Sequence, residues 1–152
     1  MFIKLKNKFG KLLIRSSLSI GIRKLGLNIC GFSYGRDVYI GEDCIIISEL
    51  DNLKHKLIFE DRVSVAPRVT FILSSNPNNS YLKEVIKVHE GSIHIEQDAW
   101  IGTGVIIYPN IRIGRGSIIA SGSVVTKDVE KFNLVGGIPA KKIKNISNEI
   151  SI

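Results

Sequence analysis

Three histidines are the side chains of this sequence best suited to moving a proton near neutral pH. His55 stands between two lysines, and we expect it to be a surface residue. His89 lies near the end of a long polar stretch, residues 74–91, where a loop that folds back could bring it to a cleft. His94 lies between two isoleucines, and on a strand its side chain should point away from the hydrophobic core. We therefore predict His89 first, and His94 second, as the catalytic base.

A repeat of six residues is the feature that must position these side chains. Branched aliphatic residues recur at this spacing in one stretch: Ile95, Ile101, Ile107, Ile113, Ile119 and Val125. Six residues advance a helix by roughly 240° beyond one turn, which excludes an amphipathic helix, whereas six is a multiple of the strand period. The third residue of each hexad is polar or proline and glycines cluster beside it, so we expect the chain to turn a corner there. Short strands joined by regular corners predict a parallel β-helix.

The same period covers residues 37–73 and 93–126, with two interruptions. The register is lost near residues 48–56. The longer break, residues 74–91, is polar and then briefly helical in character, and a break of this length inside a regular repeat is often functional. The expected segments are a basic N-terminal helical segment (1–24), the β-helix (25–135, with the 74–91 excursion) and a C-terminal tail (136–152).

Two motifs near the end of the chain carry a family resemblance. "GSVVTKDV" begins at Gly122, and "GGIPAKK" begins at Gly136. Together with the hexads, over about residues 35–145, they resemble the hexapeptide-repeat acyltransferases, especially the sugar O-acetyltransferases. The resemblance implies a left-handed β-helix prism, a homotrimer, and acetyl-CoA lying in the groove between neighbouring prisms.

The resemblance also implies a set of coenzyme-binding residues. Glycines at a corner let the thin pantetheine chain approach the backbone closely, and lysines suit the phosphates of the nucleotide. The residues that match coenzyme-contacting positions of the family are Gly102, Thr103, Gly104, Ser121, Thr126, Lys127, Lys141 and Lys144. For the acceptor sugar, the resemblance points to Asn76 and Trp100.

One position departs from the family pattern. The stretch "VTFILSSNPNNS", from Val69 to Ser80, resembles the family loop that usually carries the catalytic histidine. Here Ser74 or Asn76 stands in its place, and neither is a base near neutral pH. The loop therefore leaves the general base to another residue, for which His89 and His94 are the candidates.

Two alternatives come from other classes of protein. His89 and His94 are five residues apart with His55 upstream, which resembles the zinc-binding histidines of the left-handed β-helix carbonic anhydrases. Three histidines and a water would make zinc-bound hydroxide near neutral pH. The second histidine of that family is followed by Gly-Cys, unlike Ile95-Glu96 here, so we predict no metal site. The other alternative is a coenzyme-binding or structural β-helix that has lost the reaction.

The positive charge is concentrated at the N-terminus. Residues 1–24 hold seven lysines and arginines and no acidic residue, which accounts for the whole net charge of +7. A nucleic-acid-binding stripe over the fold is therefore not expected. Phe2, Leu5, Phe9 and Leu12 follow a helical spacing. Such a basic amphipathic helix could lie on an anionic membrane or cap the open base of the prism, and we favour capping.

The remaining features concern the compartment and the reaction. Two cysteines, Cys30 and Cys44, are too few for a disulfide framework and indicate buried thiols in a reducing compartment. No apolar run reaches the length of a membrane span, so we expect a cytoplasmic protein, and contact with the inner membrane surface is a further hypothesis. We predict an acetyl-CoA-dependent O-acetyltransferase acting on a sugar hydroxyl of a bacterial surface polysaccharide or its precursor. The identity of the acceptor, and the choice between O- and N-acetylation, stay open.

Overall fold

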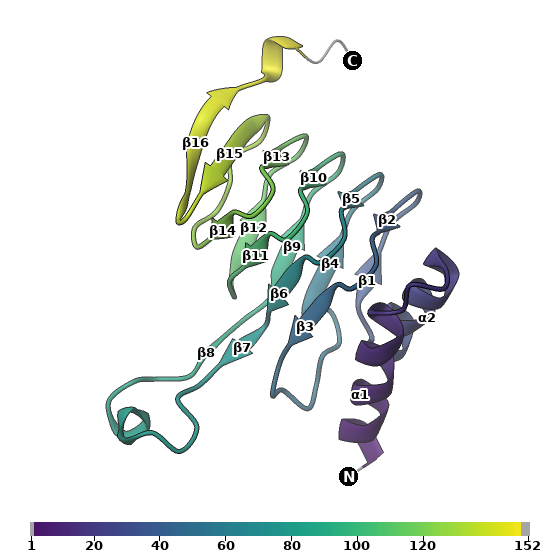
Figure 1. The fold of residues 1–152 in the computed structure, drawn as a ribbon, viewed down its shortest axis with the longest axis vertical. Helices are drawn as coiled ribbons and strands as arrows, with labels where there is room; N and C mark the ends of the chain where they lie inside the picture. The colour runs from purple at the N-terminus through teal and green to yellow at the C-terminus, as the bar shows by residue number, and fades with distance from the viewer. Residues whose placement is uncertain (1, 150–152) are drawn as a thin grey trace.

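The computed structural model describes residues 2–149, which form a three-sided parallel β-helix with two helices at one end and a β-hairpin at the other (Figure 1). The helices are α1 (Phe2–Ile14) and α2 (Ile20–Cys30). The strands of the coils are β1 (Ser33–Tyr34), β2 (Tyr39–Ile40), β3 (Ile45–Ile47), β4 (Leu57–Phe59), β5 (Ser64–Val65), β6 (Thr70–Ile72), β9 (Ile93–Ile95), β10 (Trp100–Ile101), β11 (Ile106–Ile107), β12 (Ile111–Ile113), β13 (Ile118–Ile119) and β14 (Val124–Val125).

Each coil contributes one strand to each of three sheets. Sheet A has the order β1-β4-β9-β12, sheet B contains β2, β5, β10 and β13, and sheet C has the order β14-β11-β6-β3. All pairs between these coil strands are parallel. The predicted β-helix of hexapeptide repeats is confirmed in this form, and the left-handed sense of its coils stays a prediction.

The repeated aliphatic residues fill the inside of the prism. Each of the six that define the period is at most 1% exposed. Residues at equivalent hexad positions lie beside one another across coils, as Val65, Ile101 and Ile119 do in sheet B. Within this core the rings of Phe59 and Phe71 meet edge to face, with 5.7 Å between their centroids.

The corners occupy the third and fourth residues of the hexads, in agreement with the polar third position. The fourth residue adopts a left-handed backbone conformation in five successive hexads, at Asp98, Gly104, Asn110, Gly116 and Gly122. Glycine, asparagine and aspartate tolerate this conformation better than other residues. The sequence therefore places at each corner a residue type that suits the turn.

Ion pairs join successive coils along the corner between sheets A and B. Asp61 accepts hydrogen bonds from the backbone N–H of Arg36, at 2.8 Å, and from its guanidinium, at 2.7 Å. Arg62 donates to both carboxylate oxygens of Asp98, at 2.7 and 3.0 Å. The bonds from Arg36 hold the pKa of Asp61 below its usual value, and those from Arg62 do the same for Asp98.

The helical segment is longer than predicted. It continues through α2 to Cys30, six residues beyond the expected boundary at residue 24, and the first coil starts at Ser33. Ser19 caps α2 at its start, and Gly31, in the left-handed conformation, ends it. The expected boundary rested on the basic residues, which lie on α1 and the first part of α2. The end of the helical segment is instead set by these caps.

The two helices pack closely through glycines and cover the end of the prism. A Cβ on Gly10 would lie 2.6 Å from the sulfur of Cys30, and one on Gly26 would lie 2.6 Å from the carbonyl oxygen of Gly10. α1 contacts β3 and α2 contacts β2. The side of α1 that faces inward carries Asn7, Gly10 and Ile14, whereas the apolar stripe identified in the sequence faces solvent.

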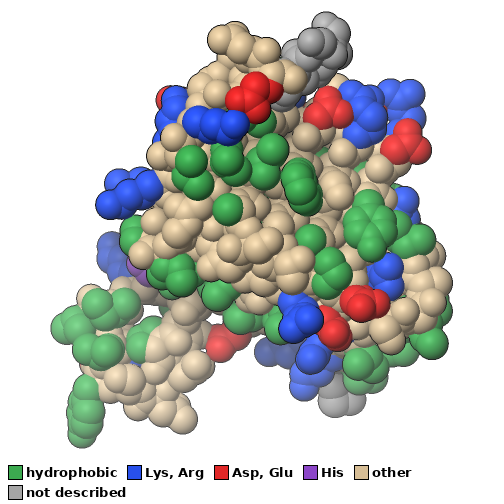
Figure 2. Space-filling model, turned by 45° about the horizontal axis from the view of Figure 1, so that its top comes forward, with side chains coloured by type: hydrophobic (Ala, Val, Ile, Leu, Met, Phe, Trp, Pro, Cys, Tyr) green, Lys and Arg blue, Asp and Glu red, His purple; other side chains and the backbone are tan. Residues whose placement is uncertain are grey.

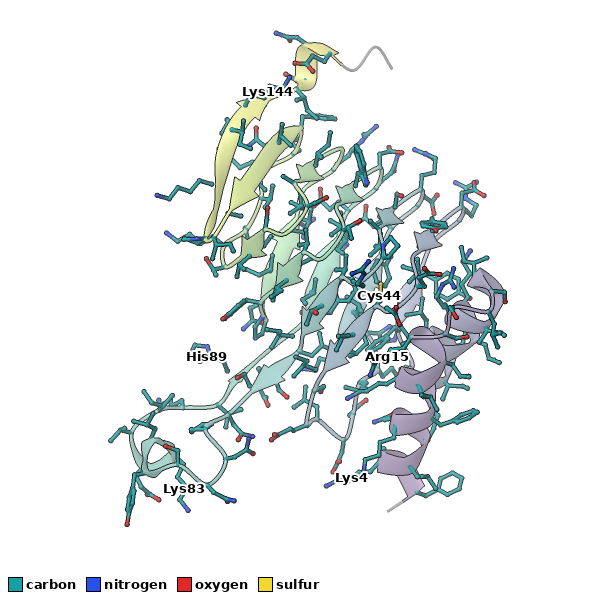
Figure 3. All side chains as sticks on the ribbon, in the orientation of Figure 1. Lys4, Arg15, Cys44, Lys83, His89 and Lys144 are labelled. Carbon is teal, nitrogen blue, oxygen red and sulfur yellow. The ribbon has the colours of Figure 1, made fainter. Side chains whose placement is uncertain are left out.

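Both cysteines are free and buried, as expected of small apolar side chains. Cys30 packs between the helices, and Cys44 lies inside the prism (Figure 3). Burial raises the pKa of each thiol to about 11, which keeps both protonated at neutral pH.

The long interruption forms an arm that projects from the prism. Its base is a two-stranded antiparallel hairpin of β7 (Ser74–Ser75) and β8 (His89–Glu90), and its tip contains the 3-10 helix η1 (Tyr81–Glu84). Figure 2 shows the arm as a lobe with hydrophobic side chains at its surface. Tyr81 is 95% exposed.

The C-terminal segment, which was expected to be a tail, contains a β-hairpin and a short 3-10 helix. β15 (Asn133–Gly137) adds to β13 in sheet B and pairs with β16 (Ala140–Asn145), followed by the 3-10 helix η2 (Ser147–Glu149). The expected boundary at residue 136 falls inside β15. β16 was missed because most of its side chains are exposed lysines and polar residues, which lack the alternation of a half-buried strand.

Candidate functional site

The corner between sheets B and C brings together residues that the sequence assigned to a coenzyme. Gly102 and Ser121 belong to successive coils, and a Cβ on Gly102 would lie 2.6 Å from the backbone nitrogen of Ser121. The N–H of Gly122 donates to the carbonyl oxygen of Thr103 at 2.9 Å. The residues predicted around this corner are therefore direct neighbours.

Two glycines leave this corner open along the prism. Gly104 and Gly122 both have the left-handed conformation, and a Cβ on either would meet no atom within 4 Å. One coil earlier, the equivalent corner carries the exposed side chain of Arg68. The two coils that contain Gly104 and Gly122, the third and fourth of the prism, thus expose their backbone along this corner. We call this exposed backbone the glycine column. A narrow amide chain could approach such a backbone closely.

The predicted lysines separate into two groups. Lys127 and Lys141 line one hollow of about 400 Å³ at the C-terminal end of the prism. Lys144 lies at a different hollow, and its ammonium pairs with the Glu149 carboxylate at 2.8 Å. Thr126 is exposed and is the residue directly before Lys127 in the chain. Within one chain β16 turns Lys144 toward the outer face of sheet B, and the assignment of all three lysines to one phosphate site stays a prediction.

Trp100 lies on the outer face of sheet B and is 53% exposed. It borders a hollow of about 620 Å³ together with Ile118, Leu134 and Lys144. An exposed aromatic face beside aliphatic side chains can pack against a sugar ring or against a second protein surface.

His89 lies at the base of the arm, on the strand that pairs with β7 (Figure 3). Its cross-strand partner in the hairpin is Ser75, the residue between Ser74 and Asn76. Directly opposite residues in antiparallel strands have Cβ atoms about 5 Å apart. The interruption folds back as the sequence suggested, and it brings an exposed imidazole beside Ser75. Because successive residues of a strand point to opposite faces, this imidazole lies on the other face of the hairpin from Ser74.

Ser74 and Asn76 have structural partners. Ser74 is buried, and its hydroxyl accepts a hydrogen bond from the backbone N–H of Glu49 at 2.8 Å. The Asn76 side chain accepts from the N–H of Asn78 at 2.7 Å and donates to the Glu49 carboxylate. Both residues therefore fix the base of the arm.

His94 and His55 lie apart from this place. His94 is on β9, and its Nε2 lies 2.7 Å from a carboxylate oxygen of Glu60 on the outer face of sheet A. The Nδ1 of His55 lies 2.7 Å from the hydroxyl of Ser33. In the described part of the chain, residues 2–149, no three metal-ligand side chains come together. The three histidines on which the zinc alternative depended are not brought to one site within a single chain.

Comparison with known proteins places the chain in a family. Residues 92–127 match the family described as bacterial transferase hexapeptide (six repeats). A chloramphenicol acetyltransferase of Klebsiella aerogenes is 31% identical in a match that covers 89% of this chain and 76% of that protein. The chain belongs to the hexapeptide-repeat acetyltransferases.

Further relatives of the chain agree with this assignment. The galactoside O-acetyltransferase of Escherichia coli is 31% identical over 118 residues, and the match spans 77% of this chain but only 58% of that enzyme. A hexapeptide-repeat acetyltransferase of Vibrio cholerae in complex with acetyl coenzyme A has the same fold, with a TM-score of 0.71, 24% identity, and coverage of 96% of this chain and 88% of that one.

One residue at the base of the arm could not be predicted from the sequence. Glu49 comes from the shorter interruption, residues 48–56, and contacts both Ser74 and Asn76. Its only signal in the sequence is the loss of the six-residue register at the end of β3. Nothing local indicates that this break meets the arm, because the two segments are 27 positions apart along the chain.

Among the helices of residues 2–149, none combines the length and the apolar character needed to span a membrane.

Proposed function

We propose that this hexapeptide-repeat acetyltransferase transfers the acetyl group of acetyl-CoA to a hydroxyl of a sugar. The observation that carries the proposal is the glycine column, where Gly104 and Gly122 leave the backbone of two coils open beside Ser121. A pantetheine chain needs close approach to backbone N–H and C=O groups, and these coils offer both. Lys127 and Lys141, at the hollow at the end of the prism, would attract the phosphates of the coenzyme.

We propose His89 as the general base. The coenzyme supplies the acetyl group as a thioester, and the acceptor oxygen forms its bond to the acetyl carbon as the carbon–sulfur bond breaks. The acceptor hydroxyl loses its proton in this attack, and His89 is exposed and held by β8 at the arm base. The His94 ring is in hydrogen-bonding contact with Glu60 on another face, which favours His89 over His94.

The proposed assembly is a homotrimer with left-handed coils. Its support is the outer face of sheet C, where Ile45 and Ile47 are exposed on β3. Ile106 and Val124, on β11 and β14, extend this face along the prism. A second copy of the chain would cover this row, and the groove between copies would place the glycine column against a neighbour. Trp100, and Asn76 at the arm base, would then contact the acceptor.

For the acceptor, we propose a bacterial surface polysaccharide or its precursor, modified in the cytoplasm at the inner membrane surface. The support is the similarity to the galactoside O-acetyltransferase, together with the basic helical end of the chain. Transfer of labelled acetyl groups to a panel of free sugars and nucleotide sugars would identify the acceptor class and separate O- from N-acetylation.

Calorimetric titration with acetyl-CoA is the direct test of the coenzyme site. We expect micromolar binding by the parent protein, and binding at least about tenfold weaker in Lys127→Glu, because a charge reversal replaces attraction to phosphate by repulsion. Lys54→Glu is the matched control, because Lys54 is an exposed lysine of the 48–56 segment, away from the hollow. An affinity equal in Lys127→Glu and Lys54→Glu would remove Lys127 from the site, and no binding by the parent would contradict the coenzyme assignment.

A further inference from the structure

A row of large apolar side chains lies exposed on α1. Its members are Phe2, Leu5, Phe9 and Leu12, and they are between 54% and 83% exposed. Their spacing places them on one side of the helix, which forms a continuous stripe. Single exposed apolar side chains are ordinary on a protein surface, but a continuous stripe indicates a surface that something covers.

The stripe cannot turn into the protein, because the opposite side of α1 is fixed there. Ile14 is 1% exposed, and the Asn7 amide donates to the carbonyl oxygen of Asp51 at 2.9 Å. Gly10 lies so close to α2 that no side chain fits between the helices. The capping of the prism is therefore complete without the stripe.

Positive charge surrounds the stripe. At about 100° per residue, Lys6 and Lys8 lie on its two sides. Lys4 and Lys11 are turned toward the 48–56 segment, where Lys4 pairs with Asp51 at 3.6 Å and Lys11 donates to the carbonyl oxygen of Ser48 at 2.9 Å. Within residues 2–149, no ion pair involves Lys6 or Lys8. These two flanking ammonium groups are available to an anionic partner.

We infer that α1 docks on an anionic lipid surface, with the stripe in the acyl region and Lys6 and Lys8 at the headgroups. A helix of this kind lies in the plane of the interface and buries its apolar side between the lipids. Long lysine side chains reach from its flanks to the phosphates. A second copy is the poorer occupant, because two stripes face to face would bring their flanking lysines together without counter-charge.

The neighbouring parts of the helical end suit the same surface. Leu18, in the turn between the helices, and Leu25, on α2, are exposed as well. Residues 1–24 contain no acidic residue that would repel the headgroups. The inference does not depend on the acetyl transfer, since none of these residues belongs to the glycine column or to the arm.

The test is co-sedimentation of the full chain with vesicles at low salt. We expect the parent to bind vesicles of phosphatidylcholine and phosphatidylglycerol in equal parts, and to bind pure phosphatidylcholine vesicles much more weakly. Phe9→Glu should lower the partition coefficient at least about tenfold, because it places a charge in the stripe. The double variant Lys6→Glu, Lys8→Glu should lower the partition coefficient by a similar factor or more, because each lysine contributes roughly fivefold to binding.

Tyr81→Glu is the matched control, because it changes an exposed apolar side chain on the arm and should leave vesicle binding within about twofold of the parent. The inference is overturned if the parent does not bind the anionic vesicles, if it binds neutral vesicles equally well, or if Phe9→Glu binds like Tyr81→Glu. It is also overturned if Phe9→Glu dissociates an assembly in sedimentation velocity while vesicles have no effect on the parent, since the stripe would then join copies. Acetyl-CoA titration of the same variants should match the parent, which separates this inference from the proposed function.

Discussion

His89 and His94 carry the same side chain but differ in what surrounds it. His94 lies against Glu60 on sheet A, whereas His89 is exposed at the arm base beside Ser75. We predict that His89→Gln lowers kcat by about 10² to 10⁴-fold, because a general base contributes that much to the rate. The measurement is steady-state acetyl transfer to a sugar acceptor, with acetyl-CoA binding followed by calorimetry.

His94→Gln is the control for this prediction and should stay within a few-fold of the parent. If the large loss appears in His94→Gln instead, the acceptor lies over sheet A. A loss of coenzyme affinity in His89→Gln would assign His89 to binding rather than to proton transfer.

Gly104 is a single backbone position that tests whether the coenzyme follows the glycine column. We predict that Gly104→Asn keeps the fold, because asparagine tolerates the left-handed conformation and nothing lies within 4 Å of its Cβ. Its side chain would fill the open space, so acetyl-CoA affinity should fall about tenfold or more. Calorimetry and thermal unfolding measure the two effects.

Gly102→Ala gives the contrast, because its Cβ would lie 2.6 Å from the Ser121 nitrogen and would strain the corner itself. It should lower the unfolding temperature, which Gly104→Asn should leave nearly unchanged. Unaltered coenzyme affinity in Gly104→Asn would show that the coenzyme does not follow the glycine column.

At the scale of elements, the ion pairs between coils make stability depend on pH. Asp61 and Asp98 have lowered pKa values because Arg36 and Arg62 donate hydrogen bonds to them. A carboxylate with a lowered pKa in the folded state contributes stability above its unfolded pKa, and this contribution is lost as pH falls through the folded pKa. We predict that the unfolding temperature begins to fall at about pH 4 and continues to fall below it.

The variant Asp61→Asn with Asp98→Asn checks this assignment. It should be less stable than the parent at pH 7, and its unfolding temperature should change less between pH 5 and pH 3, as about two carboxylates no longer take up protons. Thermal unfolding followed by circular dichroism at several pH values is the measurement. Parallel pH curves for the parent and the variant would place the acid sensitivity elsewhere in the chain.

At the scale of the whole molecule, the outer face of sheet C sets the expected assembly. We predict a particle of three times the chain mass of 16.8 kDa in sedimentation equilibrium, because the exposed Ile45 and Ile47 need a covering surface. Ile47→Glu should shift the equilibrium toward monomers, and should weaken acetyl-CoA binding if the groove lies between copies. Ile138→Glu is the control, since Ile138 is also an exposed isoleucine, at 76% against 44% for Ile47, but lies in the turn between β15 and β16. A parent that sediments as a monomer would contradict the trimer and require the coenzyme site to lie within one chain.

The six-residue period determined the prism and its corners. The reason is local, because an aliphatic residue at every sixth position and a turn residue beside it describe one strand and one corner, repeated. The neighbourhood of Gly102 and Ser121 follows in the same way, since they are 19 positions apart and one coil of three hexads is 18 residues long. Here the sequence alone predicted both the stacked coils and which residues meet at this corner.

Only the tertiary structure decided which segments meet outside the repeat. The pairing of His89 with Ser75, and the contact of Glu49 with Asn76, join segments that no periodicity relates. The stripe on α1 shows the same limit. An apolar face predicts the buried side of a helix, but Gly10 lets α2 approach from the opposite side, so close packing of backbones decided which face of α1 is covered.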